Sequence, residues 1–249
     1  MIQEELVFQK KNGHKIAGKA YLAGKDAQYP TVIFAHGFGS NYRQLQHHGD
    51  GFAEAGINCI FFDFCGGGLE SLSDGAMTQM TVLTEAEDLR EVIDQVLQLD
   101  YVDPYRLFVQ GESQGGFVAA YTAAQMPEKI KALVLWYPAF VIPDDSKKRF
   151  EKNDNTCFGM ALCPDYNRAS KDIDIFNVIT GYKGPVKIIH GEEDALVPVS
   201  YSQRAQKAYD NASLTVIAKA GHGFDGEDSS FAREQSIAFI KENLCSPLL

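Results

Sequence analysis

The chain alternates short apolar runs with amphipathic stretches. The runs are rich in β-branched and aromatic residues, which is typical of strands buried on both faces of a parallel sheet. They are Thr31–Ala35, Asn58–Phe62, Arg106–Gln110, Ala132–Tyr137, Val186–His190 and Ser213–Ala218. The helical pattern between them is clearest in Thr84–Leu99, where apolar side chains recur on one helical face. This alternation of strand and helix predicts the α/β class.

Two segments modify this picture. Strand-like residues flank Asn12-Gly13, and Asn-Gly is the strongest short signal for a hairpin, so an antiparallel edge should begin the sheet. Residues 138–182 then interrupt the rhythm with a long, partly polar segment, and connections of that length are usually functional. We expect a single domain over residues 1–249 with residues 138–182 inserted as a lid. The alternative is a structural excursion that only buries a sheet edge.

The net charge of the chain argues against two classes of binding partner. The formal net charge of −10 has the wrong sign for binding nucleic-acid phosphates or an anionic membrane surface. We therefore expect a small-molecule substrate and neither a nucleic-acid nor a membrane partner, while a homodimer stays open. The short basic segments Lys10-Lys11 and Lys147–Arg149 are interpreted as solvated surface.

The amino-terminal residues and the cysteines indicate the cellular compartment in which we expect the protein. Acidic residues stand early where a secretory signal has basic ones, and no apolar stretch approaches the ~20 residues of a membrane span. The five cysteines have scattered spacings that suit reduced thiols, so we expect a cytoplasmic protein. Cys157 and Cys163 are close enough for a metal or disulfide interpretation, but no CxxC motif or nearby histidine completes a ligand set.

The sharpest chemical signal is Gly111–Gly116, which fits G-x-S-x-G between a strand-like and a helix-like segment. A nucleophile at the tip of so tight a turn needs neighbours without side chains, which Gly111 and Gly115 provide around Ser113. A serine hydroxyl also needs a base and an acid, in the order serine, acid, histidine. His222 follows the last strand-like run and is the candidate base, and Glu192, Glu193 and Asp194 are candidate acids.

Stabilising the tetrahedral intermediate requires backbone donors. One should be the N–H of Gln114, directly after the nucleophile, and the other an N–H on the loop after an early strand, which we assign to Phe38. A second glycine-rich loop, Cys65–Gly68, lacks both phosphate-binding patterns and is interpreted as a turn at the sheet edge.

These motifs resemble those of the α/β-hydrolase superfamily over nearly the whole chain: His36–Gly39, Gly111–Gly116, His190–Pro198 and Ala220–His222. Within the superfamily, the chain resembles bacterial cinnamoyl and feruloyl esterases. It shares their length, the Ser-Gln-Gly-Gly at the nucleophile and an insertion after the sixth strand. The resemblance implies an α/β-hydrolase fold, with a mostly parallel central sheet, helices on both faces and an inserted lid. It implies no cofactor, and a triad of Ser113, Asp194 and His222 with oxyanion donors at Phe38 and Gln114.

The expected reaction is hydrolysis of a small ester through an acyl-enzyme, with a hydroxycinnamate ester as a candidate substrate. Aromatic residues near the insertion could line an acyl pocket, although core packing is an equal alternative for each. They are Trp136, Tyr137, Phe140, Phe158 and Tyr166. The sequence departs from the esterases at Glu112, where many relatives have histidine, and at Cys65–Gly68. The rival functions are a peptidase or acyl-peptide hydrolase with the same triad, and a non-catalytic scaffold.

Overall fold

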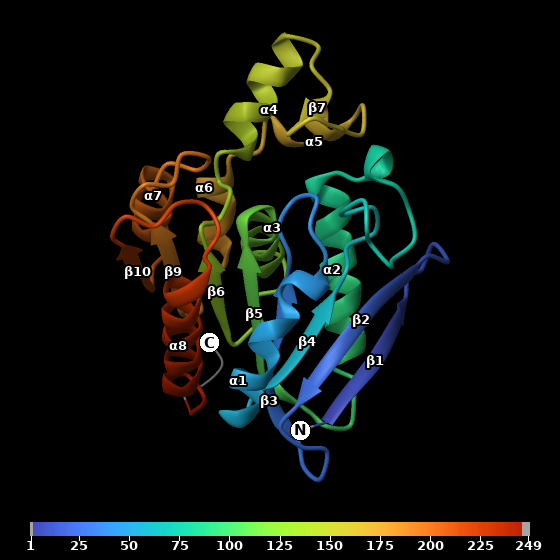
Figure 1. Ribbon diagram of the computed structural model, residues 1–249, viewed down its shortest axis with the longest axis vertical. Helices are drawn as coiled ribbons and strands as arrows, with labels where there is room; N and C mark the ends of the chain where they lie inside the picture. Colours follow the sequence, from blue (N-terminus) through green and yellow to red (C-terminus); the bar gives the residue numbers. More distant parts are fainter. Residues whose placement is uncertain (1, 246–249) are drawn as a thin grey trace.

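The computed structural model describes residues 2–245, and within them the principal sheet has the order β1-β2-β4-β3-β5-β6-β9-β10 (Figure 1). β1 pairs antiparallel with β2, β2 pairs antiparallel with β4, and every other pairing in this sheet is parallel. The predicted hairpin and the six predicted strands are therefore confirmed, although β10, at the sheet edge, is partly exposed and not buried on both faces. The strands are β1 (Ile2–Gln9), β2 (Lys15–Leu22), β3 (Tyr29–Ala35), β4 (Asn58–Phe62), β5 (Val102–Glu112), β6 (Ala132–Trp136), β9 (Val186–Gly191) and β10 (Ala212–Ile217).

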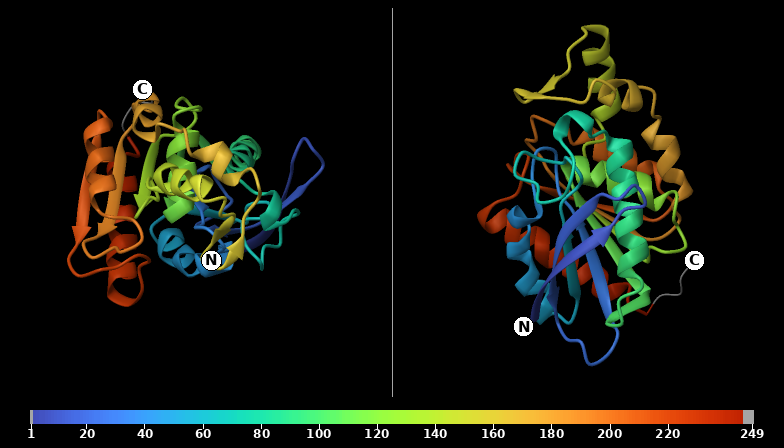
Figure 2. Two further views of the ribbon diagram at one scale, coloured as in Figure 1. Left: turned by 90° about the horizontal axis from the view of Figure 1, so that it is seen from above. Right: turned by 90° about the vertical axis from the view of Figure 1, so that its right-hand side faces the viewer.

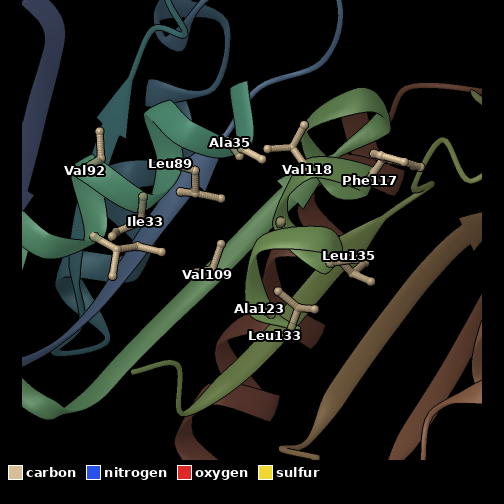
Figure 3. Packing of buried hydrophobic residues seen from close by; sticks show 14 of the residues in the cluster. Ile33, Ala35, Leu89, Val92, Val109, Phe117, Val118, Ala123, Leu133 and Leu135 are labelled. Atoms are coloured by element: carbon tan, nitrogen blue, oxygen red, sulfur yellow. The ribbon is translucent and has the colours of Figure 1, made fainter. Parts of the chain in front are cut away.

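Helices cover both faces of the sheet because alternate strand residues point to opposite sides. In β3, Ile33 points to the face of the sheet whose hydrophobic cluster includes residues of α2 (Val82–Val96), α3 (Ser113–Ala123) and α7 (Ser200–Ala208). The next residue, Phe34, faces α1 (Gly49–Glu54) and α8 (Gly226–Glu242) on the other side. Figure 2 shows these two helical layers from above, and Figure 3 shows the close packing of Ile33 and its neighbours. The α/β-hydrolase arrangement predicted from the sequence is confirmed.

The clearest predicted helix, Thr84–Leu99, begins and ends slightly earlier, as α2. Its start is fixed by Thr81, whose hydroxyl oxygen accepts the N–H of Thr84 at 3.2 Å and satisfies a donor that the first turn leaves free. Lys10 corrects the interpretation of the basic segments as solvated surface. Its ammonium group is buried in an ion pair with Asp88 on α2.

Residues 138–182 contain the short elements α4 (Ile142–Glu151), β7 (Thr156–Cys157), β8 (Met160–Ala161), α5 (Tyr166–Ser170) and α6 (Ile175–Val178). The elements from α4 to α5 lie beyond the carboxyl ends of the parallel strands, whereas α6 packs beside α7 (Figure 1). Four 3-10 helices complete the elements described: Tyr42–Gln44, Gln46–His48, Met77–Gln79 and Ile179–Gly181. None of the helices in residues 2–245 has the length and apolar composition that a bilayer crossing requires.

Candidate active site

Ser113 occupies a strained turn between β5 and α3. Its φ of 51° lies in the left-handed region, which costs a non-glycine residue of order 1–3 kcal/mol and is typical of functional sites. The flanking glycines are required sterically. A Cβ on Gly111 would lie 2.3 Å from the carbonyl oxygen of Gly115, and a Cβ on Gly115 would lie 2.2 Å from that of Ala35. The turn therefore holds the hydroxyl at the sheet edge only with this spacing of glycines.

The structure brings Ser113, His222 and Asp194 into one hydrogen-bonded chain. His222 Nε2 lies 2.9 Å from the Ser113 hydroxyl oxygen, and His222 Nδ1 lies 2.7 Å from Asp194 Oδ2. The loops after β9 and β10 supply the acid and the imidazole, because parallel strands end at the same sheet edge. Of the three candidate acids, Asp194 is buried and bonded to the imidazole, whereas Glu192 and Glu193 are exposed.

Asp194 is held in its ionised form. Burial alone would raise its pKa, but hydrogen bonds from His190 and His222 and from the Val197 N–H outweigh burial and bring the pKa well below its ordinary value. One oxygen accepts the N–H groups of Leu196 at 2.9 Å and Val197 at 2.8 Å. The carboxylate is thus a fixed acceptor for the imidazole N–H.

His190, the first residue of the His190–Pro198 motif, positions the candidate catalytic acid. Its Nε2 lies 2.8 Å from the Val197 carbonyl and 3.2 Å from the Asp194 carboxylate, while its Nδ1 lies 2.7 Å from the Ser202 hydroxyl. Because both neighbours of Nε2 are acceptors, Nε2 carries the proton and Nδ1 accepts from the serine. The buried imidazole therefore pins the acid loop to α7.

Phe38 and Gln114 are the residues whose backbone N–H groups are predicted to be the oxyanion donors. Both residues line the same cavity as Ser113, and Gln114 is in the first turn of α3, where N–H groups have no partner within the helix. The Phe38 loop is fixed by its neighbours, since His36 Nε2 accepts the Phe64 N–H at 3.1 Å. The Gly67 carbonyl also accepts the N–H of the residue after Phe38 at 2.9 Å. The glycine-rich loop thus supports the Phe38 loop.

The side chain of Gln114 links two distant elements. Its Oε1 accepts the Tyr166 hydroxyl of α5 at 2.5 Å, and its Nε2 donates to Glu85 of α2 at 2.9 Å. All three side chains are buried, and burial raises the pKa of Glu85 well above its ordinary value. This Tyr166–Gln114–Glu85 chain holds the residue after the nucleophile from both sides.

A second carboxyl, that of the partly buried Glu112, lies near the imidazole. The Tyr137 hydroxyl donates to Glu112 at 2.6 Å, and the Tyr137 ring meets the His222 ring edge-on at 4.8 Å. Burial raises the pKa of Glu112, although the hydrogen bond from Tyr137 opposes that effect. Tyr137 itself has a φ of 35°, so the predicted strand ends one residue earlier, at Trp136. This turn directs the tyrosine toward the site.

A cavity of about 750 Å³ opens onto Ser113 and His222 and is lined on its other side by residues of the 138–182 segment. Of the predicted substrate-contacting residues, Tyr137, Phe158 and Tyr166 line it. Phe140 does not, because its ring is buried against Phe117 of α3 and Phe176 of α6. For Phe140 the core-packing alternative is the one that the structure shows.

The interpretation of the basic segments as solvated surface is also wrong for Arg149. It was assigned to solvated surface with Lys147 and Lys148, yet its partly buried side chain lines the cavity. The pattern of α4 carries a faint signal, because Ile142, Asp145 and Arg149 recur at helical spacing on the face that meets the cavity.

A protein-family model described as "Serine aminopeptidase, S33" matches residues 27–164, more than half of the chain. The chain belongs to this α/β-hydrolase family. The ferulic-acid-bound structure of Est1E from Butyrivibrio proteoclasticus is similar to this α/β-hydrolase over 97% of this chain and all of that one, with 25% identity and a TM-score of 0.87. The esterase EaEST from Exiguobacterium antarcticum is similar in fold, with 18% identity, a TM-score of 0.73 and coverage of 96% of this chain and all of that one.

Among curated relatives, the acylamino-acid-releasing enzyme of Rattus norvegicus is 26% identical over 163 residues, which are 59% of this chain and 22% of that protein. This chain matches only part of its curated relatives: the alignments to the first two of them cover 36% and 37% of their length. Together these comparisons describe an esterase-like α/β-hydrolase.

Proposed function

We propose that this α/β-hydrolase is a serine carboxylesterase that hydrolyses small esters through an acyl-enzyme, with Ser113 as the nucleophile. The observation that carries the proposal is the hydrogen-bonded chain from Ser113 through His222 to Asp194, in which Ser113 and His222 line the cavity. A serine hydroxyl reacts only when a base removes its proton, and this imidazole is within hydrogen-bond distance.

In the first half-reaction, Ser113 Oγ attacks the ester carbonyl carbon while His222 Nε2 accepts the hydroxyl proton. The ester C–O bond then breaks, and His222 returns that proton to the departing alkoxide, which leaves as the alcohol. Asp194 accepts the Nδ1–H, so it keeps the imidazole in the tautomer whose Nε2 is free to act as the base and stabilises the positive charge that forms.

In the second half-reaction, a water molecule takes the place of the alcohol. His222 removes one proton from it, the oxygen attacks the acyl carbon, and the bond to Ser113 breaks as the serine recovers the proton. The carboxylic acid is released and the enzyme is regenerated. The backbone N–H groups of Phe38 and Gln114 stabilise the oxyanion in both halves, and removing such a donor in other enzymes costs about 10²–10³ in kcat.

Residues 138–182 are proposed to act as a lid that binds the acyl group. Support comes from the position of the segment across the cavity from Ser113, and from the aromatic lining by Phe158 and Tyr166. Est1E, which is similar over nearly the whole chain, was solved with ferulic acid bound. Feruloyl and cinnamoyl esters are therefore the candidate substrates.

Steady-state hydrolysis of p-nitrophenyl butyrate tests the reaction. Ser113→Ala is expected to abolish turnover while its thermal unfolding stays cooperative. Ser40→Ala removes a different hydroxyl from the same cavity and is expected to keep most of the activity. Retained turnover in Ser113→Ala would exclude Ser113 as the nucleophile. A panel from short acyl chains to methyl ferulate and methyl p-coumarate tests the substrate, and equal rates across it would contradict the feruloyl assignment.

Cleavage of amides is the second candidate function. It is favoured by the aminopeptidase description of the family and by the likeness to the acylamino-acid-releasing enzyme. The same three side chains can cleave an amide, because His222 can protonate a leaving amine as readily as an alcohol. Matched p-nitrophenyl ester and p-nitroanilide substrates with one acyl group separate the two functions. A higher kcat/KM on the anilide would favour the peptidase.

A further inference from the structure

Arg149 places a positive charge at the far end of the active-site cavity. It lies in the last turn of α4, and both Arg149 and Ile142, at the start of that helix, line the cavity. Seven helical positions correspond to about 10 Å along the axis, so the cavity follows α4 for roughly that distance. Among residues 2–245, Arg149 is the one lysine or arginine in the lining.

The guanidinium is held in place by neutral groups. Its Nε donates to Asn167 Oδ1 at 3.0 Å, one Nη donates to the Ser146 hydroxyl at 3.2 Å, and its plane lies 5.9 Å from the centre of the Tyr166 ring. Within the described part of the chain, no carboxylate oxygen lies within 4.0 Å of its nitrogens. A guanidinium has five N–H donors, so the remaining ones are left for a ligand.

Besides Glu112, which accepts the Tyr137 hydroxyl, two carboxylates line the cavity, and both have other partners. Asp145 pairs with the exposed Lys148 at 3.1 Å, and Asp154 accepts the N–H and hydroxyl of Thr156 at 2.9 and 2.7 Å. The Tyr166 hydroxyl is likewise committed, because it donates to Gln114. At this end of the cavity, Arg149 is thus the group that has N–H donors left for a ligand.

We propose that Arg149 is a specificity-determining residue that hydrogen-bonds a carboxylate at the far end of the acyl group. The inference rests on the proposed ester hydrolysis and names its substrate class: esters whose acyl group is apolar in the middle and anionic at its end. An uncharged, apolar end would leave the remaining N–H donors of the guanidinium without an acceptor in the bound complex, whereas a carboxylate matches its two-pronged donor geometry. A phenol hydroxyl would accept a weaker, uncharged hydrogen bond.

Three methyl esters of one shape test the proposal: cinnamate, 4-hydroxycinnamate and 4-carboxycinnamate. We expect kcat/KM for the 4-carboxy ester to exceed that for the unsubstituted ester by about 10- to 100-fold, the range for a hydrogen bond to a charged group. Arg149→Met should bring this ratio close to one, mainly through KM, and Arg149→Lys should restore part of it. Lys147→Met, which removes an exposed neighbouring cation outside the cavity lining, should leave the ratio unchanged.

Calorimetric binding of the same esters to Ser113→Ala makes the test independent of turnover. Tighter binding of the 4-carboxy ester, lost in the Ser113→Ala, Arg149→Met double variant, supports the proposal. Equal or weaker binding of the 4-carboxy ester, or a preference that survives Arg149→Met, overturns it. Failure of the wild-type protein to hydrolyse any of the esters would instead count against the esterase function, so the two failures are distinguishable.

Discussion

Tyr166→Phe removes one hydroxyl and tests whether residues 138–182 help to position the proposed oxyanion donor. The ring is kept, so its packing near Phe38 and Arg149 is preserved. The change deletes the 2.5 Å hydrogen bond to Gln114 Oε1 and leaves that oxygen buried with its phenol partner gone. The Gln114 side chain is then held only through its Nε2, which donates to Glu85 and to Met80 Sδ.

The magnitude follows from the burial of the amide oxygen. A buried acceptor left unsatisfied costs about 1–3 kcal/mol of unfolding free energy. For a chain of this size, such a loss lowers the melting temperature by roughly 2–12 °C. Because the backbone N–H of Gln114 remains present but less well fixed, kcat should fall by about tenfold, less than the ~10²–10³ of a deleted donor.

Tyr182→Phe is the matched control. That hydroxyl is also buried and donates to the Ile130 carbonyl at 3.0 Å, and Tyr182 does not line the cavity. Calorimetric melting and steady-state kinetics on p-nitrophenyl butyrate should show both variants destabilised, with kcat reduced in Tyr166→Phe alone. An unchanged kcat in Tyr166→Phe, or an equal reduction in both, would refute the positioning role.

Three further predictions concern the groups around the nucleophile. Asp194→Asn should lower kcat by about 10³–10⁴, because an amide favours the wrong imidazole tautomer; steady-state kinetics measure this, and a loss below tenfold would contradict it. Burial raises the pKa of Glu112, so the native state binds more protons than the unfolded state and stability falls as pH rises above the ordinary value of ~4.3. Melting curves from about pH 4 to pH 8 should show a weaker fall in Glu112→Gln, and parallel curves would argue against it. Gly115→Ala would place a Cβ 2.2 Å from the Ala35 carbonyl oxygen and should cost about 3 kcal/mol or more, whereas Gly221→Ala, with nothing within 4 Å, should melt nearly like wild type.

The central strands were predictable because β4 and β6 are short apolar runs buried on both faces, and burial leaves that pattern in the sequence itself. The residues at which the strands begin and end were less predictable from the sequence. β5 begins at Val102, ahead of the predicted Arg106, although Pro104 and Tyr105 are typical of a loop. The register shift between Tyr29 and Thr31 opposite this stretch lets the strand continue past it.

Part of the candidate site was also predictable from the sequence, and part of it was not. The positions of Ser113 and His222 follow from local turn chemistry and chain order, which a sequence contains. The Tyr166–Gln114 contact joins residues 52 positions apart, and no local periodicity encodes it. Arg149 stands in a polar run that reads as surface, and only the packing of α4 over the cavity turns it inward. Contacts made by residues 138–182 therefore needed the tertiary structure.

Reaction of the folded protein with a fluorophosphonate tests the central claim most directly, because the reagent phosphonylates only an activated serine. Mass spectrometry of the digested product should place a single adduct on Ser113. The adduct should be absent from Ser113→Ala and from heat-unfolded protein, and its formation should be greatly slowed in His222→Ala. An unmodified folded protein, or an adduct on another residue, would contradict the assignment of Ser113 as the nucleophile.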